Sequence, residues 1–189
     1  MQRILTPFCA LALLLTACGQ STPEQETDQQ ATEAAATDFG SAADVQAYLQ
    51  NIGPHVQRIS ELQALYETAL ATGADDSVDR RGTGRNLATK AADAKPQLQE
   101  LLVTFDTIEP PPLLAPFHRD VRKLINLRLD AYGKTIKGWD AELAGGEHEA
   151  IYGEVEKTLA EANQLIQALN EQMVQITTSL ASAASATSP

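Results

Sequence analysis

The central part of the chain repeats apolar residues at alternating steps of three and four. In the first such segment these positions are Val45, Leu49, Ile52, Val56, Ile59, Gln63, Tyr66 and Leu70. In the last they are Val155, Leu159, Ala162, Ile166, Leu169, Met173, Ile176 and Leu180. Such steps keep side chains on one face of an α-helix. Because strand-like alternation is missing, the pattern predicts amphipathic helices that each present an apolar seam.

Two middle segments share this period, and helix-breaking residues separate all four. Ser41 with Asp44 is typical of a helix start. The proline run in EPPP ends the second segment and begins the third, and Gly145-Gly146 ends the third. Residues 73–85, GADDSVDRRGTGR, are interpreted as a loop. The predicted helices are 41–72, 84–108, 112–144 and 147–180.

Short connections between these helices favour antiparallel neighbours. We therefore expect an all-α fold, an antiparallel up-down-up-down four-helix bundle of residues 41–180, about 45–50 Å long. Pro54 and Pro96 lie inside predicted helices whose apolar period continues across them. They predict kinks in long helices and not breaks.

The first 18 residues follow a different pattern. Arg3 is the only charged residue among them, and residues 4–15 are almost wholly apolar. This is typical of a secretory signal, and it is shorter than the about 20 apolar residues of a membrane span. The segment ends in Leu15-Thr16-Ala17-Cys18, which resembles the lipobox of bacterial lipoproteins.

The resemblance to a bacterial lipoprotein implies a lipid on the sulfur of Cys18 and cleavage before this residue, which removes residues 1–17 as a signal peptide. The acyl chains, of the palmitate type, would hold the protein on a membrane outside the cytoplasm. Gly19 is not the aspartate that commonly retains such proteins at an inner membrane, so the resemblance implies the outer membrane if the cell has two membranes. An ordinary cleaved signal or a buried N-terminal helix are the alternatives.

Polar segments flank the predicted bundle. Residues 18–40 carry five acids, no base and one large apolar side chain, Phe39. Such a composition cannot bury enough surface to fold, so it predicts a disordered acidic tether. Residues 181–189, ASAASATSP, predict a second disordered segment.

The negative net charge of the chain makes some classes of binding partner unfavourable. The chain has 25 Asp plus Glu against 14 Lys plus Arg, a formal net charge of −11. This disfavours nucleic acid, whose affinity comes chiefly from cations that neutralise phosphates. It also disfavours a polybasic attachment to anionic lipid.

Signs of chemistry in the sequence are few. A ferritin-like di-metal site needs Glu-x-x-His, and the three histidines are preceded at that spacing by Ile52, Ala115 and Gly145. The chain has no CxxCH for haem and no GxSxG nucleophile motif. We therefore expect no metal, no cofactor and no enzymatic activity.

Three arginines stand together in this acidic chain, in RRGTGR. Arg80, Arg81 and Arg85 precede a predicted helix, where backbone amides and guanidinium groups could hold a phosphate or carboxylate. The stretch lacks the complete glycine pattern of a dinucleotide loop or a P-loop. A solvated loop is therefore the alternative to an anion-binding site.

Opposite charges gather on the last two predicted helices. The third carries six cations, Arg119, Arg122, Lys123, Arg128, Lys134 and Lys137, and the fourth is mostly acidic. This favours pairing within the molecule, and a basic face for an acidic partner is the alternative. Gln63 and the aromatic residues of the seams are expected in the core: Tyr48, Tyr66, Phe105, Tyr132 and Trp139.

These patterns lead to two hypotheses of function. The first is a non-enzymatic, lipid-anchored interaction module that binds a protein or another component of the cell envelope. The second is an extracytoplasmic small-ligand carrier or sensor. Its pocket would lie between the helices near Pro54 and Pro96, with Arg80, Arg81 and Arg85 at the rim.

Overall fold

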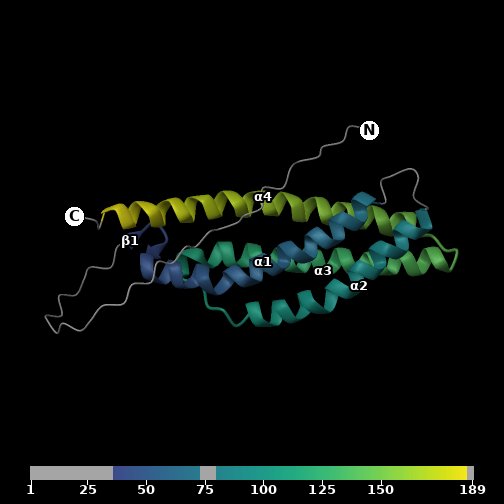
Figure 1. The fold of residues 1–189 in the computed structure, drawn as a ribbon, viewed down its shortest axis with the longest axis horizontal. Coiled ribbons are helices and arrows are strands. Elements are labelled where there is room, and N and C mark those ends of the chain that lie inside the picture. The colour runs from purple at the N-terminus through teal and green to yellow at the C-terminus, as the bar shows by residue number, and fades with distance from the viewer. Residues whose placement is uncertain (1–35, 73–79, 187–189) are drawn as a thin grey trace. The chain divides into compact units, whose positions relative to one another are not determined.

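The computed structural model describes residues 36–72 and 80–186, and it is almost entirely helical. Four helices follow one another along the chain: α1 Ala42–Thr72, α2 Arg80–Phe105, α3 Ala115–Leu143 and α4 Glu149–Ala186 (Figure 1). Smaller elements are the strands β1 Ala36–Thr37 and β2 Gly40–Ser41 and the 3₁₀ turn η1 Pro112–Leu114. The predicted all-α class is confirmed.

The helix α3 is the central element of this unit. It packs along both α2 and α4, and α1 packs against α2. In Figure 1 the four helices lie lengthwise beside one another, which agrees with these contacts. In contrast, α1 and α4 touch only sparsely. The helices therefore enclose a core around α3, with few close backbone approaches between α1 and α4.

The core contains the residues that the apolar period selected. All five aromatic residues expected there are buried, and Phe105 and Tyr132 are fully excluded from solvent. Gln63 is also buried, at 3% exposure, and its Nε2 donates to Glu67 Oε1 at 2.7 Å. The hydrogen bond explains how an amide can occupy a seam position, because a buried polar group without a partner is costly.

Local signals fixed several helix ends. Ser41 Oγ accepts the backbone N–H of Asp44 at 3.3 Å and caps α1, as its spacing predicts. After α3, Gly145 adopts a φ of +68°, and the Gly146 N–H bonds to the Ala141 carbonyl at 2.9 Å. A positive φ favours glycine, so this residue ends the helix at Leu143.

The two helix-interior prolines do not interrupt their helices. α1 continues through Pro54 and α2 continues through Pro96. The prediction that these prolines do not break the helices is therefore confirmed. Each proline still removes one backbone donor from its helix.

Residues 80–85 differ from the predicted loop, because α2 begins at Arg80. The two glycines made a helix look unfavourable, since each costs up to about 1 kcal/mol relative to alanine. Packing offsets that cost at Gly84, which is buried directly against Trp139. The preceding residues 73–79 lie outside the described part.

The predicted disorder at both ends of the bundle needs correction. α4 continues to Ala186 instead of ending at 180, since Ala183 is buried and no glycine or proline interrupts residues 181–186. At the other end, residues 36–41 form a two-stranded hairpin in which Ala36 pairs with Ser41. Asp38 N–H donates to Ser179 Oγ at 2.9 Å, and Phe39 packs against the core. Residues 1–35 and 187–189 lie outside the described part.

Candidate functional site

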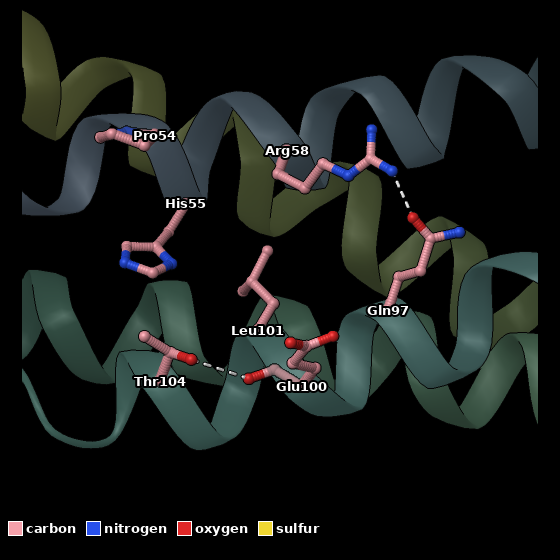
Figure 2. Close-up of a pocket in the computed structure, with 7 residues that line it drawn as sticks. All are labelled: Pro54, His55, Arg58, Gln97, Glu100, Leu101 and Thr104. Carbon is pink, nitrogen blue, oxygen red and sulfur yellow. Dashed lines mark hydrogen bonds between the residues drawn. The ribbon is translucent and has the colours of Figure 1, made fainter.

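A cleft of about 280 Å³ lies between α1 and α2 (Figure 2). Its lining consists of three residues of α1 and four of α2: Pro54, His55, Arg58, Gln97, Glu100, Leu101 and Thr104. It lies beside both helix prolines, because Pro54 lines it and Gln97 follows Pro96. Arg85, predicted for the rim, is not among the lining residues.

Hydrogen bonds fix the polar side chains across this cleft. Arg58 donates from Nη2 to Gln97 Oε1, which joins the two helices, and from Nη1 to Glu61 Oε2 at 2.7 Å. Figure 2 shows the guanidinium reaching toward Gln97 and the ring of His55 directed toward α2. Arg58 and Gln57 lower the pKa of the Glu61 carboxyl. The cleft therefore combines a cation, an acid at Glu100 and an apolar floor at Leu101, a set suited to binding.

A histidine and aromatic cluster continues from the cleft into the core. The ring of His55 meets Phe105 edge-on, with centroids 6.2 Å apart. Phe105 stacks on His118, with centroids 4.2 Å apart and planes inclined by 15°. On His118, Nδ1 lies 3.1 Å from the hydroxyl oxygen of Tyr48. One cluster thus connects α1, the end of α2 and the start of α3.

Burial sets the protonation of this cluster. It raises the pKa of Tyr48, so the phenol keeps its proton, and its hydroxyl shares a hydrogen bond with Nδ1 of His118. Burial also lowers the pKa of His118, against an opposing effect of Asp106. Asp106 is held by Arg122 through two bonds, Nε to Oδ1 at 2.7 Å and Nη2 to Oδ2 at 2.9 Å. The neutral imidazole is the favoured form.

The arginine stretch RRGTGR packs partly against Trp139 of α3. Gly84 lies so close to Trp139 that an added Cβ would be 2.9 Å from Cε3. The guanidinium carbon of Arg85 lies 6.0 Å from the centroid of the same ring, within cation–π range. The side chains of Arg80 and Arg81 lie outside the described part, so their role in anion binding stays a prediction. Arg85 has an indole as its neighbour.

Charges on the last two helices pair partly within the molecule. Lys123 of α3 lies 2.8 Å from Glu161 of α4, and this carboxylate raises the pKa of the lysine. Lys134 lies 2.6 Å from Asp130 on its own helix and donates to Thr158 of α4 at 3.2 Å. These contacts agree with the intramolecular interpretation, although exposed pairs contribute little to stability.

One buried cation was missed at the sequence level. The sequence pattern places Arg128 among the six cations of the third predicted helix, yet its side chain is only 1% exposed. A signal was present, because it follows Ile125 by three residues and precedes Tyr132 by four. That spacing places it on the seam itself.

Within residues 36–72 and 80–186, no group of three or more histidine, cysteine, aspartate or glutamate side chains is placed to hold a metal ion. None of the helices in that part has the length and apolar character that crossing a membrane requires. Cys18, the predicted lipidation site, lies outside it. Comparisons with protein-family models, curated proteins and solved structures give no match.

Proposed function

We propose that this chain is a lipid-anchored protein of the cell envelope that acts by binding and not by catalysis. The anchor rests on Leu15-Thr16-Ala17-Cys18 at the end of an apolar run. A thioether-linked diacylglycerol with a further acyl chain adds enough buried CH₂ groups for stable attachment, at about 0.8 kcal/mol each. The folded helices would then stand outside the cytoplasm, on the outer membrane where a cell has two.

The anchor is tested with Cys18→Ala in the full chain expressed in a bacterial host. The wild-type protein should gain the mass of its acyl chains and enter the detergent phase of a phase separation. The variant should lose that added mass and remain in the aqueous phase. An unmodified wild-type protein that begins at Met1 would contradict the proposed anchor.

We further propose that the helices form an up-down-up-down four-helix bundle. Two contacts support it. Tyr48 near the start of α1 touches His118 near the start of α3, and Tyr66 late in α1 bonds to Thr135 late in α3 at 2.7 Å. α1 and α3 then run in the same direction, as alternate helices of such a bundle do.

The binding role is carried by one observation, the cleft between α1 and α2. At about 280 Å³ it lies just below the range of ligand pockets, which occupy roughly 300–1,000 Å³ and enclose most of their ligand. An open cleft with Arg58 and Glu100 on its walls suits protruding side chains of a protein partner. The proposed partner is therefore a protein or another envelope component that covers this face.

A pair of neighbouring substitutions tests the cleft. Thr104→Arg places a long cation in the cleft, whereas Val103→Arg changes an adjacent residue that is 70% exposed and does not line it. Envelope proteins cross-linked to the wild type and to Val103→Arg should be lost from Thr104→Arg. If both variants retain the same cross-linked partners, the cleft is not the contact surface.

A small-ligand carrier is the second candidate, because the cleft lies beside Pro54 and Pro96, where such a pocket was expected. Native mass spectrometry of the protein purified from its envelope separates the two functions. A stoichiometric added mass that Thr104→Arg abolishes would establish the carrier. A mass equal to the lipidated chain alone would reject it.

A further inference from the structure

Arg128 is a buried cation in the middle of α3. Its side chain is 1% exposed and is the largest of those fully buried in the described part. The rings of Tyr66 and Tyr132 stack on one another beside it, with centroids 4.7 Å apart. Because a guanidinium remains protonated in proteins, this position carries a positive charge inside the core.

Few of its donors have partners. A guanidinium has five N–H groups, and Nη2 of Arg128 donates to Asn163 Oδ1 at 3.0 Å. Across residues 36–72 and 80–186, Arg128 Nε is the one buried side-chain nitrogen or oxygen without a hydrogen-bond partner. No carboxylate in that part lies within 4.0 Å of this guanidinium. A buried charge left in this state is strongly destabilising.

The acid that acts on Arg128 electrostatically, Glu67, is already engaged. Its Oε1 accepts a hydrogen bond from Gln63 Nε2 at 2.7 Å. Asn163, the one hydrogen-bonded partner described, is a neutral amide on the exposed face of α4. With Tyr66 and Glu67 of α1 and Asn163 of α4 as its neighbours, the guanidinium lies between these two helices, which approach each other closely at few positions.

We propose that Arg128 is a binding site for the carboxylate of a small organic acid, which enters between α1 and α4. The Nε–H and one Nη2–H of a guanidinium lie parallel on one edge and match the two oxygens of a carboxylate. In Arg128 the Nε–H on this edge is unpaired, and Nη2 has a second hydrogen besides the one given to Asn163. The site is separate from the α1–α2 cleft and does not depend on it.

Thermal unfolding of the full-length protein in sodium acetate tests the proposal, with sodium chloride at equal ionic strength as the reference. A ligand that binds only the folded state raises Tm as its concentration exceeds Kd. The wild type should gain several degrees in acetate over chloride, and the gain should saturate. The Nε–H resonance of Arg128, assigned by its loss in Arg128→Met, should shift over the same concentrations.

Three variants complete the test. Arg128→Met should fold, because replacing a buried ion by an apolar side chain of similar size is often neutral or stabilising, and it should lose the acetate-specific gain. Arg128→Lys keeps the charge without the paired N–H edge and should retain less than half of the gain. Arg122→Met, at an exposed position of the same helix, should retain all of it.

Two results would overturn the proposal. One is an acetate effect that is equal in the wild type and in Arg128→Met, including no effect in either. The other concerns Glu67→Gln, which should leave the acetate gain intact or enlarge it, since it removes a nearby negative charge. If Glu67→Gln instead lowers Tm in the wild type but not in Arg128→Met, then Arg128 is paired with Glu67 and needs no ligand.

Discussion

The two ends of α3 pack by opposite means. Near its start, His118 stacks on Phe105 and is hydrogen-bonded to Tyr48, so the contact is made by large rings with polar atoms. Near its end, Gly138 has no side chain, and a Cβ added there would lie 2.6 Å from Cε1 of Tyr152 on α4. The contact at the start of α3 is made by side-chain rings. The contact at its end is possible only because Gly138 has no Cβ.

This difference predicts how each end responds to change. The start of α3 should lose stability when a ring is removed or when the imidazole gains a proton. The end should lose stability when a single methyl group is added. The contact at the start of α3 therefore depends on pH, through His118. The contact at the end of α3 depends only on steric fit at Gly138.

The largest effect is expected for Phe105→Ala. Phe105 is fully buried between His55 and His118, so its removal takes apolar surface from the core and leaves a cavity. The free energy of unfolding should fall by about 3–5 kcal/mol. Urea unfolding followed by circular dichroism measures it. Val103→Ala, two residues earlier and largely exposed, should change stability by less than about 0.5 kcal/mol.

At the other end, Gly138→Ala should destabilise although alanine is the better helix former. Tyr152 cannot move away freely, because its hydroxyl donates to Glu142 at 3.1 Å. Overpacking of about 1–3 kcal/mol should exceed the gain in helix propensity of up to about 1 kcal/mol. Gly153→Ala, with open space around it on α4, is the matched control and should stabilise. Equal effects of the two substitutions would show that close packing at Gly138 does not matter.

Periodicity predicted the parts of the fold that side chains determine. The steps of three and four located the four helices and the buried rings of Tyr66 and Phe105, because the buried positions of a helix carry apolar residues at a regular spacing. Glycine has no apolar side chain and so does not contribute to this pattern. Neither Gly138 nor Gly84 could therefore be recognised from the sequence as a position of close packing. For the same reason, the sequence pattern predicts a loop at residues 80–85, where the structure has the start of α2.

The candidate sites were predicted less completely than the helices. The prolines indicated the region of the α1–α2 cleft, but its lining depends on which faces of the two helices meet, and spacing within one helix does not determine that. Arg128 was missed because a cation is usually a surface residue, and its burial follows from the packing of α1, α3 and α4 around it. The lining of the cleft and the burial of Arg128 both depend on contacts between residues that lie far apart in the sequence.

Acid should weaken the start of α3 selectively. Burial lowers the pKa of His118 below its ordinary value of 6.5 in the folded protein, so unfolding takes up a proton between that lowered pKa and 6.5. The contribution of neutral His118 to stability is therefore complete above pH 6.5 and is lost as pH falls through this window. Urea unfolding between pH 7.5 and 5 should show a steeper loss for the wild type than for His118→Gln. Parallel curves would contradict the assignment.

Asp106→Asn should have the smallest effect on stability and should change the pH response at the same end of α3. The Asp106–Arg122 pair is exposed and screened by solvent, so its loss should cost little stability despite the two parallel hydrogen bonds. The carboxylate also opposes the lowering of the His118 pKa. Without it, the Arg122 cation acts unopposed, so NMR titration of the His118 ring should give a lower pKa than in the wild type. Glu171→Gln, an exposed acid on α4, should leave that titration unchanged. A pKa of His118 that rises in Asp106→Asn would mean that hydration of the ring, and not these two charges, governs its protonation.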